Sequence, residues 1–170
     1  MKNIVLIGFM GSGKSTVAKV LKSRTKMKII DTDREITKRA GMTIPEIFEK
    51  HGEEYFRNLE TTLLEDLQSQ ENIIVSCGGG IVLKEENVAK MQKIGTVVLL
   101  SASPITTFHR VKNNTNRPLL NGNMNVPYIQ KLMVARKPYY KRAAQVTVVV
   151  DHKGLRQVAE EIIEKVEGRG

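Results

Sequence analysis

The apolar positions of the chain fall into two alternating patterns. Short and nearly continuous apolar runs alternate with segments in which apolar side chains recur every three or four residues, as in residues 53–67. Continuous apolar runs are typical of parallel strands that helices cover on both faces. The alternation therefore predicts an α/β fold with three layers and a five-stranded parallel sheet. The expected strands are residues 3–7, 28–30, 72–76, 96–100 and 145–150.

Two further segments are marked by their local sequence. Thr43 and Glu46 have the spacing of a capping box, with Pro45 between them, and predict a helix start ahead of Ile47 and Phe48. By contrast, residues 112–125 are rich in Asn and Gly between two helical patterns. This segment is either a mobile lid or merely a poorly ordered connection.

Length and composition place limits on the architecture. The chain has 170 residues, 41% of them hydrophobic, which fits one domain over residues 1–170. No apolar run approaches the ~18 residues that cross a bilayer, and no cleavable signal is evident, so we expect a cytoplasmic protein without a membrane partner. The single cysteine, Cys77, has no intrachain partner, and we interpret it as a buried filler and not a nucleophile.

The charge balance indicates anionic ligands. Lys and Arg exceed Asp and Glu by nine, which suits either a nucleic-acid groove or a cleft for small anions. Aromatic residues make up 5% of the chain and Trp is absent, so few side chains can stack on bases. The composition therefore favours small anions over nucleic acid.

A glycine-rich stretch follows the first expected strand. Residues 8–15 read GFMGSGKS and match the pattern G-x-x-x-x-G-K-[ST] between a strand and a helix. The alternative, a flexible surface turn, does not require this combination. In a phosphate cradle, backbone N–H groups and a helix start near Lys14 face the phosphates, the Lys14 ammonium bridges the terminal ones, and Ser15 holds Mg²⁺. The stretch therefore predicts nucleotide binding.

Two carboxylates follow the second expected strand. Asp31 and Asp33 are two residues apart, so in an extended chain both would face the same side, at the edge where open α/β folds bind ligands. One carboxylate near Mg²⁺ and one near an alcohol would serve phosphoryl transfer. Asp33 alternatively caps a helix over residues 34–40. The guanine signature N-K-x-D does not occur, which excludes GTPases of the Ras type.

Two more features come from the middle of the chain. Arg57 and Glu60 lie three apart on one helix face, so Glu60 can orient the guanidinium; a solvated salt bridge is the alternative. The sequence SCGGG at residues 76–80 leaves bare N–H groups at the end of a strand, where a ligand hydroxyl or carboxylate can approach.

These motifs together give the chain a resemblance to shikimate kinase over nearly its whole length. The resemblance implies a fold like that of nucleoside monophosphate kinases with strand order 2-3-1-4-5. It also implies transfer of the ATP γ-phosphoryl group to the 3-hydroxyl of shikimate, in chorismate and aromatic amino acid biosynthesis, by a monomer. The stretches that carry it are GFMGSGKST at 8–16, DTD at 31–33, FRNLE at 56–60, CGGG at 77–80, NRPLL at 116–120 and RKPYY at 136–140.

The resemblance also assigns roles to residues. Asp33, Lys14 and Arg117 would be catalytic, with Asp33 as the base and Arg117 entering on a lid. The residues implied for ATP are Gly11, Ser12, Gly13, Lys14, Ser15, Thr16, Arg110, Arg117 and Pro118. Those implied for shikimate are Asp33, Arg57, Gly78, Gly79, Gly80 and Arg136. Mg²⁺ would bind Ser15 directly and Asp31 through water.

The chain departs from the family after its last strand. Members often carry an adenine loop with Arg, Asn and Pro there, whereas this chain has DHKG at residues 151–154, which we interpret as a solvated turn. Two rival functions stay open: a kinase of the same fold acting on gluconate or a nucleoside monophosphate, and a nucleotide-dependent module that binds nucleic acid.

Overall fold

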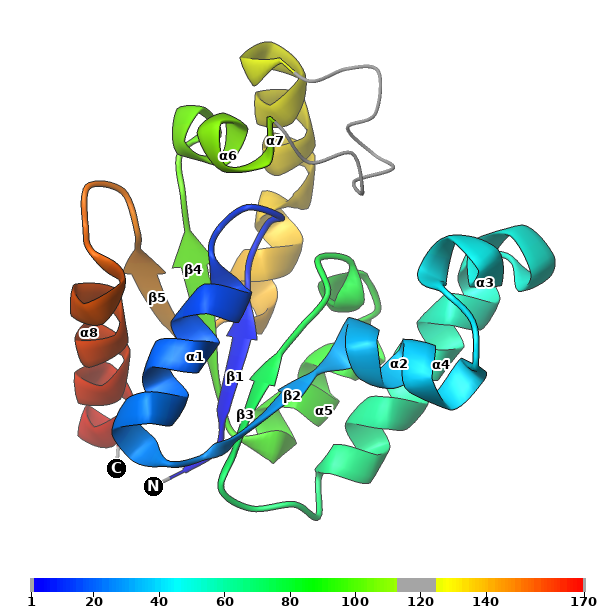
Figure 1. The fold of residues 1–170 in the computed structure, drawn as a ribbon, viewed down its shortest axis with the longest axis horizontal. Helices are drawn as coiled ribbons and strands as arrows, with labels where there is room; N and C mark the ends of the chain where they lie inside the picture. The colour runs from blue at the N-terminus through cyan, green and yellow to red at the C-terminus, as the bar shows by residue number, and fades with distance from the viewer. Residues whose placement is uncertain (1, 113–124, 170) are drawn as a thin grey trace.

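The five expected strands form one parallel sheet in the computed structural model, which describes residues 2–112 and 125–169. The strand order is β2-β3-β1-β4-β5, as the resemblance implied, and every pairing is parallel. The carboxyl ends of all strands therefore meet at one edge of the sheet (Figure 1). The strands are β1 (Ile4–Ile7), β2 (Lys28–Asp31), β3 (Ile73–Ser76), β4 (Thr96–Ser101) and β5 (Val146–Val149).

Helices cover both faces of the sheet and complete the three predicted layers. In Figure 1, α1 and α8 lie on one side of the sheet and α4, α5 and α7 on the other. The helices are α1 (Lys14–Thr25), α2 (Thr32–Ala40), α3 (Ile44–His51), α4 (Glu53–Leu67), η1 (Ile81–Leu83), α5 (Glu85–Ile94), α6 (Pro104–Val111), α7 (Val126–Ala143) and α8 (Leu155–Gly168). Within the described ranges, none of them is both long and apolar enough to cross a membrane.

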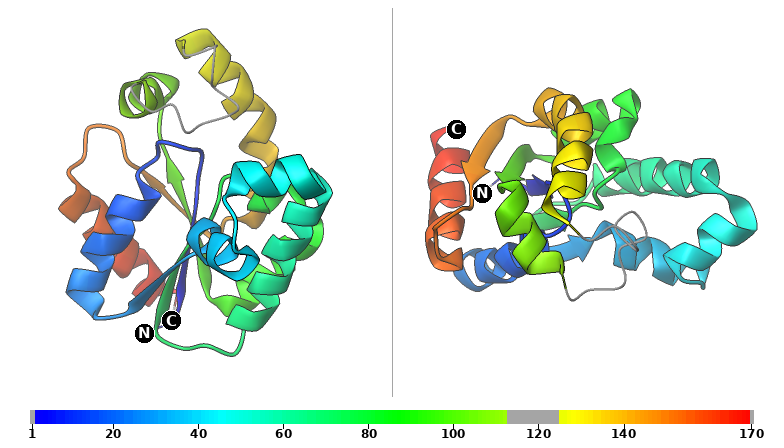
Figure 2. Two further views of the ribbon diagram at one scale, coloured as in Figure 1. Left: turned by 45° about the vertical axis from the view of Figure 1, so that its right-hand side comes forward. Right: turned by 90° about the horizontal axis from the view of Figure 1, so that it is seen from above.

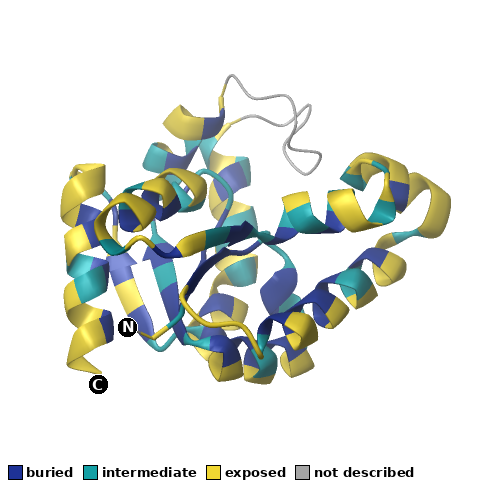
Figure 3. Ribbon diagram, turned by 60° about the horizontal axis from the view of Figure 1, so that its bottom comes forward, coloured by how far each residue is buried: buried dark blue, intermediate teal, exposed yellow. Residues whose placement is uncertain are grey.

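The core consists of two clusters, one on each face of the sheet. Successive strand residues point to opposite faces, so Ile4 and Leu6 of β1 pack toward α1 and α8. Val5 and Ile7 pack into the cluster that α4, α5 and α7 cover. Figure 3 shows that most strand residues and the inward faces of the helices are buried. Burial on both faces explains why β1, β3 and β4 are continuous apolar runs, whereas the edge strands β2 and β5 are only partly buried.

The predicted start signal of α3 is confirmed, whereas the alternative that Asp33 caps α2 is wrong. The capping box is formed: Glu46 N donates to Thr43 Oγ1 at 3.3 Å, and Thr43 N donates to Glu46 Oε1 at 3.2 Å. Asp33, however, is not the cap of α2. Asp31 caps it by accepting a hydrogen bond from Arg34 N at 3.1 Å, so Asp33 lies in the first helical turn.

The connection between α6 and α7 is described only at its ends. Residues 113–124 lie outside the described residues, and with them lie most of the expected lid, Arg117 and Pro118. Asn125 caps α7 by accepting from Tyr128 N at 2.8 Å. The left view in Figure 2 places α6 and the first turns of α7 beyond the carboxyl edge of the sheet.

Candidate active site

A cavity of about 560 Å³ opens at the carboxyl edge of the sheet. It lies where open α/β folds bind ligands, and it brings together most of the predicted site residues. Ser12, Arg57, Gly80 and Arg136 are not in its wall. The lining residues are Met10, Gly11, Gly13, Lys14, Ser15, Thr16, Asp31, Asp33, Ser76, Cys77, Gly78, Gly79, Arg110 and Leu155.

The loop between β1 and α1 forms one wall of the cavity. Ser12 N donates to Phe9 O at 3.1 Å, and the side chains of Phe9 and Ser12 are buried, so the loop is packed and is not a flexible surface turn. Gly13 has φ +94°, and a Cβ there would lie 2.5 Å from Arg110 Nη1. Only glycine therefore fits this conformation and this neighbour.

Lys14 begins α1, as predicted, and its side chain turns back over this loop. Its Nζ donates to Gly8 O at 2.6 Å and to Phe9 O at 3.3 Å. The ammonium group is thus held at the same place as the positive end of the α1 dipole. This arrangement is suited to terminal phosphate groups.

The residues expected to hold Mg²⁺ fit that ion. Ser15 and Asp31 both line the cavity, and Asp31 Oδ1 accepts from Arg34 N, which leaves Oδ2 for a water ligand. Mg²⁺ usually takes one or two protein oxygens and completes its shell with waters and phosphate oxygens. Residues 2–112 and 125–169 contain no group of three or more His, Cys, Asp or Glu side chains that could hold a metal ion.

Asp33 reaches the cavity from the first turn of α2. The expectation that an extended chain would align it with Asp31 was wrong, because only Asp31 belongs to the strand. Both carboxylates nevertheless line the cavity. Asp33 lies so close to Gly78 that a Cβ there would be 2.5 Å from Asp33 Oδ1. Gly78 N also donates to Thr32 Oγ1 at 2.9 Å, which ties the start of α2 to the glycine segment.

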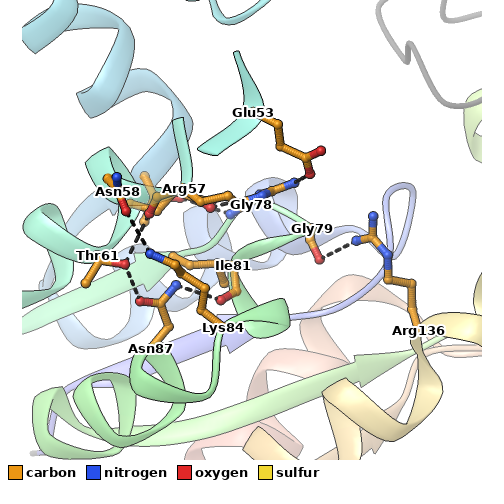
Figure 4. A network of polar contacts seen from close by, with 12 residues as sticks. Glu53, Arg57, Asn58, Thr61, Gly78, Gly79, Ile81, Lys84, Asn87 and Arg136 are labelled. Carbon is orange, nitrogen blue, oxygen red and sulfur yellow. Dashed lines mark hydrogen bonds and ion pairs between the residues drawn. The ribbon is translucent and has the colours of Figure 1, made fainter. Parts of the chain in front are cut away.

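Arg57 is held by two carboxylates of its own helix. Its Nη1 pairs with Glu60 Oε1 at 2.8 Å and its Nη2 with Glu53 Oε1 at 3.2 Å. Glu60 is fully buried, so the alternative of a solvated salt bridge is wrong. A Cβ on Gly80 would lie 2.5 Å from Arg57 Nη1, so the guanidinium lies directly against the glycine segment (Figure 4).

The environment of this pair shifts both of its pKa values. Burial raises the pKa of Glu60 to about 7, although Arg57 acts to lower it. Burial alone would lower the pKa of Arg57, but Glu60 and Glu53 outweigh it and raise that pKa, so the guanidinium stays charged. Arg57 Nε and Glu60 Oε2 are buried without a hydrogen-bond partner.

Arg136 approaches the glycine segment from the opposite side. It projects from α7, and its Nη1 donates to Gly79 O at 3.1 Å. Figure 4 shows Arg57 and Arg136 on either side of the Gly78 to Gly79 segment. The two predicted arginines are therefore brought together around the glycines, although they come from helices that are far apart in the sequence.

Further polar contacts, which the sequence did not indicate, hold this segment in place. Thr61 Oγ1 donates to Asn87 Oδ1 at 2.7 Å, and Asn87 Nδ2 donates to Ile81 O at 2.9 Å (Figure 4). These buried contacts join α4 and α5 to the chain just after the glycines. No motif in the sequence indicates them, because Thr and Asn are common in exposed helices.

The far end of the cavity contains Arg110 and a residue that the sequence did not indicate. Arg110 Nη1 donates to Gly11 O at 3.5 Å, and Leu155, at the start of α8, also lines the cavity. In the preceding turn His152 is exposed, as a solvated turn requires, but Lys153 pairs with Glu161 at 2.8 Å. Asp151 accepts from Ser103 N at 3.0 Å and so anchors the turn.

Cys77 is buried between β3 and the glycines, as expected of a filler. Its exposed fraction is 2%, and burial raises the pKa of its thiol. The thiolate, which is the nucleophilic form, is therefore disfavoured.

Comparisons with known proteins agree on one family. A family model described as shikimate kinase matches residues 10–167. The shikimate kinases of Caldanaerobacter subterraneus and of a Sulfurihydrogenibium species are 42% and 44% identical; each alignment covers 99% of this chain and all of the relative. The structure of shikimate kinase from Acinetobacter baumannii in complex with shikimate is similar with a TM-score of 0.91 and 32% identity, over 99% of this chain and 94% of that chain.

Proposed function

The chain belongs to the shikimate kinase family of ATP-dependent kinases, and from this premise we propose that it transfers the γ-phosphoryl group of ATP to the 3-hydroxyl of shikimate. One observation carries the proposal. A single cavity joins a phosphate cradle, at Lys14 and Ser15, to Asp33, which lies against the segment that Arg57 and Arg136 flank. The cradle is complementary to a phosphoryl donor, and Asp33 with the two arginines is complementary to an anionic alcohol.

The donor half of the site is assigned to the loop between β1 and α1. The backbone of Gly11, Ser12, Gly13 and Thr16 surrounds the phosphates, and Lys14 neutralises their charge. Ser15 and, through water, Asp31 hold Mg²⁺, which supplies charge neutralisation and orientation of the phosphates when bound.

Adenine is assigned to the far end of the cavity. Arg110 offers a planar guanidinium for stacking, and Leu155 offers an apolar surface in the same cavity. Pro118, which the family resemblance also implies for adenine, lies outside the described residues.

The acceptor half is assigned to residues around the glycine segment. Two guanidinium groups, of Arg57 and Arg136, suit one planar carboxylate because each offers paired donors in a fixed fork. The segment from Gly78 to Gly80 lets ring hydroxyls approach the backbone closely. The shikimate carboxylate therefore faces the arginines and its hydroxyls face the glycines and Asp33.

Asp33 is assigned as the base of the reaction. It accepts the proton of the 3-hydroxyl as that oxygen attacks the γ-phosphorus, and the bond from the γ-phosphorus to the bridging oxygen breaks so that ADP leaves. Lys14 neutralises charge on the transferring group. Arg117, which lies outside the described residues, is assigned to neutralise the same charge. Substrate position, more than covalent chemistry by the protein, supplies most of the catalysis in such a transfer.

ADP release from the purified protein tests the proposal. Mg²⁺-ATP is combined with shikimate, gluconate, AMP, single-stranded RNA or no acceptor, and the product is identified by ³¹P and ¹³C NMR. We expect turnover with shikimate and phosphate on its 3-oxygen. Turnover with gluconate or AMP in preference to shikimate would overturn the acceptor, and salt-sensitive RNA binding without turnover would favour a nucleic-acid module.

We also propose that the enzyme acts as a cytoplasmic monomer without a nucleic-acid or membrane partner. Aromatic side chains that could stack on bases are few, which supports this assignment. Sedimentation equilibrium checks it, since a mass near 19.1 kDa is expected and about twice that mass would contradict it.

A further inference from the structure

Tyr140 shares a hydrogen-bond acceptor with Arg136. It lies four residues after Arg136 on α7, so both side chains leave the same helix face. Tyr140 Oη donates to Gly79 O at 2.8 Å, and Arg136 Nη1 donates to the same oxygen at 3.1 Å. A carbonyl oxygen has two lone pairs, and here α7 supplies a donor to each.

The Tyr140 hydroxyl is a fixed and permanently protonated donor. Its side chain is 6% exposed and belongs to the core cluster, and its hydroxyl is held by the hydrogen bond to Gly79 O. Burial raises the pKa of Tyr140 to about 12, although the nearby Arg136 and Arg57 act to lower it. The hydroxyl is therefore neutral and able to donate throughout the physiological pH range.

Fixing Gly79 O also fixes the peptide that follows it. In a trans peptide, the C=O of Gly79 and the N–H of Gly80 point in opposite directions. Holding the oxygen toward α7 therefore turns the Gly80 N–H away from α7. Within the described ranges, neither the Gly79 nor the Gly80 N–H donates a backbone hydrogen bond to another residue.

Other contacts hold the same helix segment against the chain around the glycines. Arg142 Nη2 donates to Val82 O at 3.1 Å, and Gln92 Nε2 donates to Ala143 O at 3.2 Å. These bonds keep the end of α7 in place whether or not Tyr140 has its hydroxyl. Removal of that hydroxyl alone therefore perturbs the Gly79 peptide and leaves the helix docked.

We propose that Tyr140 is a positioning residue for the acceptor site. Its hydroxyl holds the Gly79 carbonyl so that Arg136 and the Gly79 and Gly80 amides are preorganised for shikimate. The inference rests on the proposed function, because it assigns these groups to shikimate. The inference adds Tyr140, a residue that contacts neither ATP nor shikimate in the proposed function.

The test compares Tyr140→Phe with Tyr139→Phe in the full chain. Tyr139 is 38% exposed and its ring lies near Arg142. Tyr139→Phe therefore removes the same hydroxyl group at a position away from the glycines and serves as a matched control. We expect Tyr140→Phe to raise the shikimate KM about two- to tenfold. The ATP KM and the ADP dissociation constant should stay within about twofold, and Tyr139→Phe should match the wild type.

A second measurement does not depend on turnover. In ¹H–¹⁵N spectra of the ligand-free protein, the Gly79 and Gly80 amide signals should shift in Tyr140→Phe and not in Tyr139→Phe. Unmoved signals, an unchanged shikimate KM, or a parallel rise of both KM values would each overturn the inference. If the wild type fails to phosphorylate shikimate but the two glycine signals shift, the proposed function fails and the positioning of the Gly79 peptide stands.

Discussion

The two ends of the cavity are built in different ways. The phosphate-binding part of the nucleotide end comes from one short stretch, residues 8–16, in which backbone groups and Lys14 supply the binding surface. The acceptor end is assembled from α2, α4, α7 and the end of β3, and side chains carry its charge. A local motif therefore specifies the phosphate-binding part, whereas the acceptor end forms only when four elements pack together.

The two ends also differ in electrostatic cost. The Lys14 ammonium group donates hydrogen bonds to carbonyl groups of its own loop at the cavity wall. Arg57 instead pairs with the fully buried Glu60, and each of the two keeps one polar atom buried without a partner. Burying such a pair costs free energy that packing elsewhere must offset, which natural proteins accept mainly at functional sites. The acceptor end is thus the more strained part of the design.

Asp33→Asn should show the largest effect and separate chemistry from nucleotide binding. Asn can accept a hydrogen bond but cannot take the proton of the alcohol, so kcat should fall about 10²- to 10⁴-fold. The ADP dissociation constant, measured by calorimetry, should change less than about twofold. Asp66→Asn, which alters an exposed carboxylate paired with Arg39, is the control and should keep kcat. A parallel loss of ADP affinity would remove the separation between the two ends.

The pH dependence of stability tests the buried charge. Folding raises the pKa of Glu60 from 4.5 to about 7, so between these values the folded state binds the extra proton. Its stabilising contribution is full below pH 4.5 and is lost as the pH rises through 7. This difference in pKa corresponds to about 3 kcal/mol.

Denaturant unfolding at pH 5 and pH 8 measures this contribution. From the lower to the higher pH, the wild type should lose about 2 to 3 kcal/mol more unfolding free energy than Glu60→Gln. Glu53→Gln, which alters the exposed carboxylate on the same guanidinium, should retain the wild-type loss. Equal losses in wild type and Glu60→Gln would show that the acceptor end carries no such cost.

The difference between the two ends also explains what could be predicted from the sequence. The strands, the capping box at Thr43 and the loop to Lys14 depend on neighbours within a few residues, and their patterns are correspondingly clear. The alternative that Asp33 is a cap is wrong because Asp31, two residues earlier, caps the helix instead. Spacing alone does not decide between two equivalent carboxylates.

The missed residues all act across long sequence separations. Tyr140 and Gly79 are 61 residues apart, and Thr61 and Asn87 are 26 apart. Their side chains are ordinary for the helices in which they occur, so only the folded structure shows that they meet. The burial of Glu60 likewise depends on how α4 packs and not on its spacing from Arg57.

Two glycine variants should separate the ends by KM. In Gly13→Ala, a Cβ at φ +94° and 2.5 Å from Arg110 Nη1 strains the loop, so the ATP KM should rise about tenfold. In Gly80→Ala, the Cβ displaces the flexible Arg57 guanidinium, so the shikimate KM should rise about tenfold. Gly168→Ala, whose Cβ meets open space, is the control. If each variant raises both KM values equally, the ends are not independent.

Cys77→Ala should have the smallest effect, although Cys77 lies between the two ends and lines the cavity. Because burial raises the pKa of the thiol, it takes no part in proton transfer, and kcat and both KM values should change less than about twofold. Ellman's reagent should label the wild type only as fast as the protein unfolds. Rapid labelling that abolishes activity and that shikimate prevents would instead place the thiol at the acceptor end. That result would add a reactive thiol to the acceptor end, where we otherwise expect charge and shape alone to determine shikimate binding.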